Sequence, residues 1–439
     1  MKHLRTILFA VALLGALPAL AVDWTNPDSV VQAAISANPS LAALSAAIRA
    51  AQERVVPAGS LPNPMFVTGV ENGPVNFSYD SMTMYTVGAS QTFVRKSRRD
   101  GLRRSAELDV ERLRREYESR KAEVERDVRM AYIGAAAAQN EIAATEEITR
   151  LLQSVTESSR IRYETGAVPQ ADLIRAMLEE STVEHQLIAL RRQRNAATAR
   201  LLPLLDLPPN APIPSFSLKH EMEHGHDHGF DANLPDVTPA IAELQAEVAR
   251  ADEQIRLAKL ATKPDVSVEA SYGFRPRDVD MVTVVGRIEL PIRRSTLIEP
   301  RIREAFARRE AALQQIEVLR RQLRQDLGAA TVLRSEAIEQ INLHVDKLVP
   351  AGKLGFESAL ASYQTGRTTF DAVLGSLRTY LALNVDYYDF LRQQMEAEAD
   401  IDAIRRGARS GISGGNAMTP APMSSFPATG PTPASTTMQ

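Results

Sequence analysis

The chain contains an internal repeat, and this repeat restricts the possible folds more than any other feature. The segment NPSLAALSAAIRAAQERVVPAGSLPNP begins at Asn38, and TPAIAELQAEVARADEQIRLAKLATKP begins at Thr238. The two segments align without a gap at an offset of 200 residues, which pairs Pro64 with Pro264. Because the prolines coincide as well as the helix-forming residues, chance similarity does not explain the match. The repeat predicts two copies of one structural unit.

A short turn motif repeats at the same offset. Tyr163-Glu-Thr-Gly166 and Tyr363-Gln-Thr-Gly366 each interrupt a long stretch of helix-forming sequence. A glycine at this place is typical of a helix C-terminus, and Pro169 is typical of the start of the next helix. Each half is therefore predicted to consist of a helix, a strand pair, a long helix, a turn and a further helix.

The predicted strand pairs lie at 65–93 and 265–291. In the second pair, apolar and polar side chains alternate along 266–273 and 282–290, and the first pair shows a weaker form of this pattern. One apolar and one polar face per strand is typical of a strand between lipid and water. An ordinary half-buried hairpin gives the same pattern, so the strands alone do not distinguish the two.

The long helices favour the membrane interpretation. Between Arg98 and Arg160 there is no proline and there are only two glycines. Apolar residues follow one another there at spacings of three and four, which is the pattern of a coiled-coil seam. A helix of this length would extend roughly 90 Å, too far for a compact globule. The second half repeats the pattern over 300–362, with an irregularity predicted at Pro350.

Four strands are too few to close a membrane barrel. Open sheet edges are not tolerated in lipid, and membrane barrels need eight or more strands. If the strand pairs enter a membrane, several copies of the chain must share one barrel. The sequence therefore predicts a homo-oligomer.

At this point the chain resembles the TolC family of outer-membrane efflux ducts, and most closely its heavy-metal branch, the CzcC and CusC type. The segments that carry the resemblance are NPSLAAL (38–44), PNPMFVTGVEN (62–72), GASQTFVRKSRR (88–99), YETGAVPQADLIRA (163–176), IELPI (288–292) and YQTGRTTFDAVL (363–374). The resemblance extends over nearly all of the mature chain. No single segment is specific, but their order and duplication are.

The resemblance implies a mainly α-helical fold: a duplicated coiled-coil α-barrel in the periplasm, with four membrane strands per chain. Three copies would close a shared 12-stranded barrel in the outer membrane. It also implies that both turns lie at the periplasmic tip and bind a membrane-fusion adaptor, which works with an inner-membrane RND pump. The docking residues would be Tyr163, Thr165, Gly166, Tyr363, Thr365 and Gly366.

The family also carries acidic residues that line the closed aperture just past each turn. Asp172 matches this position in the first half. In the second half Asp371 comes one residue early, and Ala372 occupies the matching position. An acid in the first turn of a helix also interacts favourably with the helix dipole, and this role explains both residues equally well.

The chain ends outside the two repeats carry other signals. Basic residues, a short apolar run and Ala19-Leu20-Ala21 predict a signal peptide over 1–21, with the mature chain starting at Val22. The chain has no cysteine, so lipid attachment through cysteine is not expected. The first repeat is predicted over 22–202, a Pro/His-rich linker over 203–237, the second repeat over 238–406, and a disordered tail over 407–439.

The linker contains a histidine run. Its members are His220, His224, His226 and His228, with acidic residues between them. Imidazoles at such spacing bind zinc, copper or nickel, and in a flexible linker the affinity would be modest. The alternative is a solvated polar loop. No other cofactor is expected.

The leading hypothesis is a passive efflux channel for divalent heavy-metal cations. An organic-solute channel of the same fold and a structural coiled-coil protein of the envelope are the alternatives. The net charge of −3 gives no basic surface for nucleic acid. An enzyme is not expected, because the sequence shows no nucleophile–base pair and no phosphate-binding loop.

Overall fold

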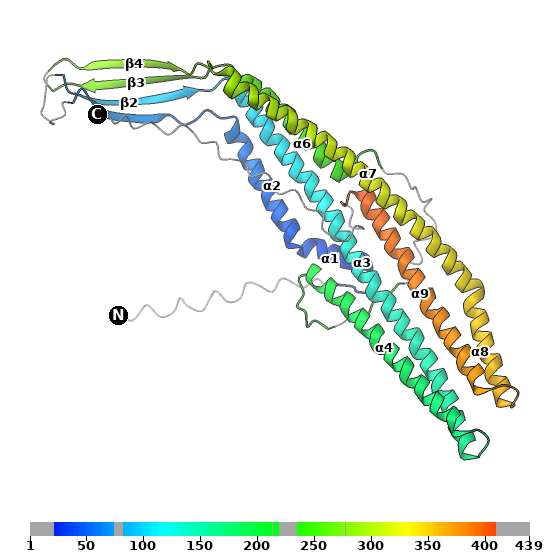
Figure 1. Cartoon of the computed structure of the whole chain (residues 1–439). Coiled ribbons are helices and arrows are strands. Elements are labelled where there is room, and N and C mark those ends of the chain that lie inside the picture. Colours follow the sequence, from blue (N-terminus) through cyan, green and yellow to red (C-terminus); the bar gives the residue numbers. More distant parts are fainter. Residues whose placement is uncertain (1–21, 74–81, 213, 219–234, 277, 410–439) are drawn as a thin grey trace, which may run out of the picture.

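The structure, a computed structural model, describes residues 22–73, 82–212, 214–218, 235–276 and 278–409. Long helices run side by side, and one sheet extends from one end of them (Figure 1). This mainly helical architecture with a small antiparallel sheet confirms the predicted fold class. The predicted signal peptide, the histidine run and residues 410–439 lie outside the described residues.

After its first helix, the first half has the same order of elements as the second half, namely a helix, two strands, a long helical stretch and a final helix. In the first half they are α1 (Pro27–Ala37), α2 (Pro39–Ala58), β1 (Met65–Glu71), β2 (Met84–Phe93), α3 (Lys96–Glu164) and α4 (Gln170–Leu204). In the second half they are α6 (Pro239–Leu260), β3 (Val266–Phe274), β4 (Met281–Ile288), η1 (Arg294–Ile298), α7 (Glu299–Leu343), η2 (His344–Leu348), α8 (Val349–Gln364) and α9 (Phe370–Arg406). The segments η1 and η2 are π-helical.

The four strands form one antiparallel sheet in the order β1-β2-β3-β4. The pairing of β2 with β3 joins the two halves and places Ala89 opposite Ala270. Within the described residues, the outer edges of β1 and β4 pair with no other strand. The sheet is therefore open on both sides.

The pairing register separates the side chains into two unlike faces. One face carries the large exposed apolar side chains Phe66, Val70, Tyr85, Val87, Phe93, Val266, Val268, Tyr272, Phe274, Val282, Val284 and Ile288. The other face is mostly polar, and on it Arg287 pairs with Glu269 at 2.5 Å. A sheet with one apolar exposed face and one polar face suits lipid on one side and water on the other.

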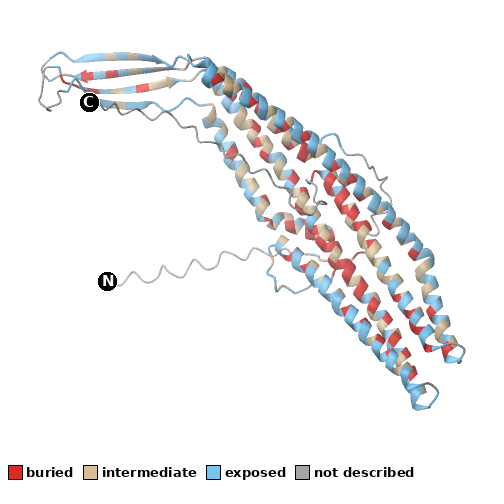
Figure 2. Cartoon of the chain, viewed as in Figure 1, coloured by how far each residue is buried: buried red, intermediate tan, exposed pale blue. Residues whose placement is uncertain are grey.

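The long helix α3 forms the middle of the helical part. It spans 69 residues without a break, so it is roughly 100 Å long. Buried residues concentrate along α3 and α9 (Figure 2). The apolar residues of the predicted seam that are buried are Val110, Leu113, Val124, Val128, Ala131, Ala135, Ala138 and Ile142, while Ala106 and Tyr117 are half-buried.

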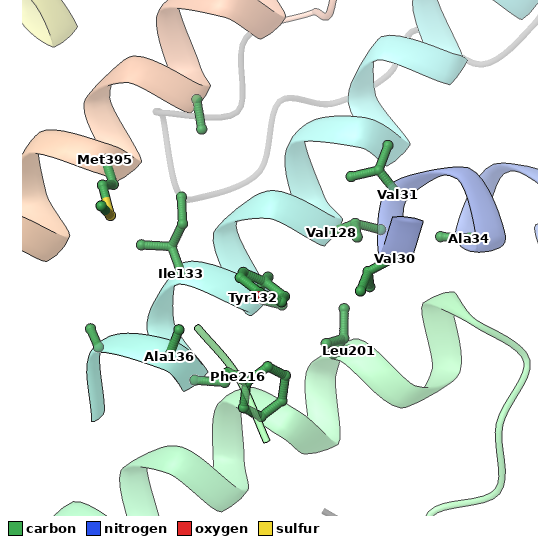
Figure 3. Close-up of a cluster of buried hydrophobic side chains, with 14 of the residues drawn as sticks. Val30, Val31, Ala34, Val128, Tyr132, Ile133, Ala136, Leu201, Phe216 and Met395 are labelled. Carbon is green, nitrogen blue, oxygen red and sulfur yellow. The ribbon is translucent and has the colours of Figure 1, made fainter. Parts of the chain in front are cut away.

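The largest hydrophobic cluster surrounds the middle of α3 (Figure 3). Tyr132 is fully buried there, and its ring packs edge-on against Phe216 at 5.4 Å between centroids. Its hydroxyl lies 3.0 Å from the carbonyl oxygens of Trp24 and Ser217. The cluster thus holds the N-terminal segment and the start of the linker against the helices.

The corresponding long helix of the second half is interrupted. The π-helical segment η2 ends just before Pro350, where the sequence predicts an irregularity. Proline lacks an N–H group and its ring collides with the carbonyl four residues back. A wider turn at this place relieves both problems.

The folded part continues slightly beyond residue 406. Gly407 has a φ of +98° and ends α9. Ala408 is buried, and Arg409 pairs with Glu243 at 2.6 Å. Residues 407–409, predicted to belong to the tail, are therefore packed against both halves, since Ser119 of α3 donates to the carbonyl of Gly407 and Ala408 clusters with Ala122 of α3.

In the described part of the chain, no single helix combines the length and the apolar character that a membrane crossing needs. The helices α1 and α2 meet these conditions only as a pair, bent by 49° between them.

Candidate functional site at the helical tip

Both predicted docking turns lie at the end of the helices away from the sheet (Figure 1). In the first turn, the N–H of Gly166 donates to the carbonyl of Tyr163 at 2.9 Å, and the N–H of Ala167 donates to that of Arg162 at 2.8 Å. The corresponding bonds of the second turn measure 3.0 and 2.9 Å. This is the Schellman pattern that closes a helix C-terminus.

The glycines have the backbone conformation that the sequence predicts. Gly166 has a φ of +71° and Gly366 a φ of +74°. The hydroxyls of Thr165 and Thr365 each donate back into the last turn of their helix, with the shorter contact at 3.0 Å in both. Backbone and threonine geometry are therefore the same in both halves.

The two tyrosines lie in different surroundings. Tyr163 is 39% exposed, whereas Tyr363 is only 4% exposed. The Tyr363 ring packs on Phe370 at 5.3 Å, and the guanidinium of Arg162 lies 4.5 Å from its centre. Arg162 also donates to the backbone carbonyl of Tyr363 at 2.9 Å. The second turn is therefore anchored to the first hairpin through its tyrosine.

The two candidate aperture acids lie close to one arginine. Arg175 reaches Asp371 at 3.0 Å and Asp172 at 3.8 Å. Asp172 is the more enclosed acid, with 15% of its side chain exposed against 65% for Asp371. Although Asp371 is displaced by one residue in sequence, folding brings it to the same place as Asp172. Their role in an aperture stays a prediction.

A second ion pair lies further from the tip and was not predicted. Arg378 on α9 makes two-pronged hydrogen bonds to Glu179 on α4, the longest at 2.9 Å. The Glu179 side chain is 6% exposed, and this pairing raises the pKa of Arg378. The burial of Glu179 could have been predicted from its spacing to Ala176 and Val183, which places this acid on the buried stripe of its helix.

A buried acid lies in the wall between α3 and α9. Glu141 is 5% exposed. Burial, together with the nearby negative charge of Asp389, raises its pKa to about 7, although Arg392 acts in the opposite direction. Its burial was not predicted, because Glu141 is not itself a seam position and directly precedes the seam residue Ile142.

The four linker histidines lie outside the described residues. Within the described ranges, no group of His, Asp and Glu side chains has the arrangement of a metal site. The linker residues just before the run are held on α3, where Gln139 exchanges hydrogen bonds with the backbone of Phe216 at 3.0 and 3.2 Å. The described linker residues 214–218 therefore lie beside the middle of α3.

The sequence of the first repeat is similar to one known protein family. Residues 30–205 match the family model described as outer membrane efflux protein. No curated protein matches the sequence. The sequence pattern of this family is thus present in the first repeat.

Solved structures extend the likeness to most of the chain. The outer membrane protein VceC of Vibrio cholerae is 15% identical with a TM-score of 0.72, and the match covers 88% of this chain and 97% of VceC. CusC is 15% identical with a TM-score of 0.72, covering 87% and 92%. The MtrE channel of Neisseria gonorrhoeae is 16% identical with a TM-score of 0.71, covering 87% and 90%. The protein therefore has the same fold as these outer-membrane proteins.

Proposed function

We propose that the protein is the outer-membrane channel of a tripartite RND-type efflux system, with its helical part in the periplasm. The observation that carries this proposal is the sheet, because its apolar face is exposed and both its edges are open. In lipid such edges must be paired. Three copies, each adding four strands, would pair every edge in a barrel of 12.

The assembly is tested by extracting the protein from outer-membrane fractions with detergent. A trimer that survives mild heating before electrophoresis is the expected result. A monomer in the soluble periplasmic fraction would contradict the proposal and would favour a structural coiled-coil protein of the envelope.

We infer that the two turns, with Tyr163, Thr165, Gly166, Tyr363, Thr365 and Gly366, bind the periplasmic adaptor of the inner-membrane pump. Their support is the repeated backbone geometry at the end of the chain farthest from the sheet. An added side chain would meet no other atom at either glycine, since nothing lies within 4 Å. A substitution there changes the backbone without creating a collision.

The docking proposal is tested with Gly166→Val and Gly366→Val. Valine at positive φ costs about 1–2 kcal/mol per turn, so adaptor cross-linking and efflux should fall while the trimer remains. Gly375→Val is the matched control, because Gly375 is an exposed helical glycine near the tip whose φ is not positive. Loss of the trimer with unchanged cross-linking would show that the turns are only structural.

The proposed cargo is a divalent heavy-metal cation. Its support is the resemblance of the turn segments to the heavy-metal branch and the acids Asp172 and Asp371 near the tip. Deleting the gene should lower resistance to individual metals. Increased sensitivity to organic compounds alone would instead identify an organic-solute channel.

The histidine run is proposed to be a weak metal buffer and not part of the conduction path. Neutral imidazoles bind zinc, copper or nickel, and they release metal as they become protonated near pH ~6.5. Deleting 220–228 should reduce metal binding by the purified protein and leave the trimer intact. Identical calorimetric titrations with and without the segment would contradict this role.

A further inference from the structure

The two ends of the sheet differ in charge. At the end next to the helices, residues 61–64, 94–98, 263–265 and 289–294 carry six basic and two acidic side chains. At the far end, the described residues 71–73, 82–83, 275–276 and 278–280 carry one basic and three acidic side chains. The excess of positive charge is therefore confined to the junction between sheet and helices.

Part of this positive charge is exposed and not balanced by acids. Among the described residues, no ion pair is formed by Lys96 or Arg293, and both are exposed. Arg294 is 68% exposed and reaches only the half-exposed Glu299, at 3.7 Å. Arg98 differs, because it pairs with Asp265. Lys96, Arg293 and Arg294 are thus available to an external anion.

The basic side chains directly follow the apolar face of the sheet. Leu290 is 68% exposed and Ile292 is 84% exposed, and Arg293 and Arg294 come next in the chain. On β2, Phe93 is 49% exposed and precedes Lys96 by three residues. The chain at the ends of β2 and β4 therefore shows the same order of an exposed apolar side chain and then a cation.

We propose that Lys96, Arg293 and Arg294 form a basic belt that binds the phosphate groups of anionic phospholipids. The inference rests on the proposed function, in which the apolar face contacts lipid. The belt then lies where acyl chains end and headgroups begin, on the side of the membrane that faces the helices. Long basic side chains at this depth place their charge among the headgroups.

The position favours lipid over other anions. A soluble anion would need enclosing hydrogen-bond donors, whereas these side chains are spread over two segments along the border of an apolar surface. Each basic side chain near an anionic membrane surface strengthens binding roughly fivefold. Removing three should weaken the preference for anionic lipid by about tenfold to a hundredfold, and salt should weaken the wild-type preference.

The test compares insertion of the full detergent-purified protein into two kinds of vesicle. One kind contains phosphatidylcholine only, and the other also contains phosphatidylglycerol. The variant carries Lys96→Gln, Arg293→Gln and Arg294→Gln. The control carries Arg192→Gln, Arg200→Gln and Lys353→Gln, which are exposed basic residues on α4 and α8 with no ion pair among the described residues. All samples have the same ionic strength, which is set with inorganic phosphate. The phosphate also serves as a free anion that competes with the lipid headgroups.

The expected result is a preference of wild type and control for phosphatidylglycerol vesicles, lost in the belt variant while insertion into phosphatidylcholine is unchanged. Insertion of all proteins without any lipid preference would overturn the belt and leave the channel proposal standing. Failure of wild type to enter either vesicle would overturn both. Loss of the trimer in the belt variant would instead show that these cations form contacts between copies. If phosphate alone suppressed the preference for phosphatidylglycerol vesicles, the cations would be a site for free anions.

Discussion

The two tip turns have the same backbone and unlike environments. Both end a helix with a glycine at positive φ and both use a threonine hydroxyl in the same way. Tyr163 nevertheless faces solvent, whereas Tyr363 is buried against Phe370 and Arg162. The chain therefore reverses in the same way in both halves, but only the second turn is packed against its neighbours through its tyrosine.

The long helices show a second difference of the same kind. All the residues of α7 that are buried are apolar, whereas those of α3 include Glu141 and Thr145. Polar groups in a wall of packed helices make its stability depend on conditions such as pH. Of these two helices, α3 is thus the one whose packing is expected to depend on pH, through the buried carboxyl group of Glu141.

The largest expected effect comes from truncating the two tyrosines. Tyr363→Ala should lower the free energy of unfolding by about 3–5 kcal/mol, as for other large buried side chains. Tyr163→Ala should change it by less than about 0.5 kcal/mol. Urea unfolding followed by circular dichroism measures both. Equal losses would mean that Tyr163 is covered in the assembled protein and that the two turns are alike.

The next largest effect is a dependence of the free energy of unfolding on pH, which arises from Glu141. Its pKa is raised from 4.5 to about 7, so between these values the folded protein holds a proton that the unfolded chain has lost. Stability therefore falls as pH rises through this window, by about 3 kcal/mol at pH ~8. Glu141→Gln should remove most of this fall and leave stability at pH ~4.5 unchanged.

The matched control for Glu141 is Glu118→Gln, which changes an exposed carboxylate on the same helix. Unfolding midpoints measured from pH ~4.5 to ~8 should follow wild type in this variant. If Glu141→Gln also follows wild type at every pH, the wall between α3 and α9 is not pH-sensitive through this residue.

The smallest expected effect is the difference in stability lost when each of the two ion pairs near the tip is removed. Arg378→Ala leaves the buried Glu179 without its partner, and we expect a loss of about 1–2 kcal/mol, since water reaches the exposed side of the pair. Arg175→Ala removes a contact with the largely exposed Asp371 and should cost less than about 1 kcal/mol. Calorimetric unfolding of both variants gives the comparison, and a larger loss for Arg175 would reverse the order.

Local sequence patterns were sufficient to predict the repeat, the strand pairs, the long helices and the glycine turns. Each of these depends on periodicity or on backbone preferences of single residues, such as Gly166 and Pro350. The ion pair between Glu179 and Arg378 could not be predicted, because its partners lie 199 positions apart and meet only once the hairpins pack. The same holds for the approach of Asp371 to Arg175.

The π-helical segment η2 shifts the rotational phase of the second long helix. A wide turn holds one residue more than an α-helical turn, so every side chain beyond it is rotated by about 100°. The buried positions near the first turn are 152, 155 and 159, whereas those near the second are 356 and 363. Subtracting the repeat offset of 200 from 356 and 363 gives 156 and 163. The spacing of three and four residues in α3 would instead bury positions 155 and 162, which come one residue earlier. The second long helix therefore presents a different set of positions to the interior near its turn, and Tyr363 faces inward where Tyr163 at the corresponding repeat position faces outward.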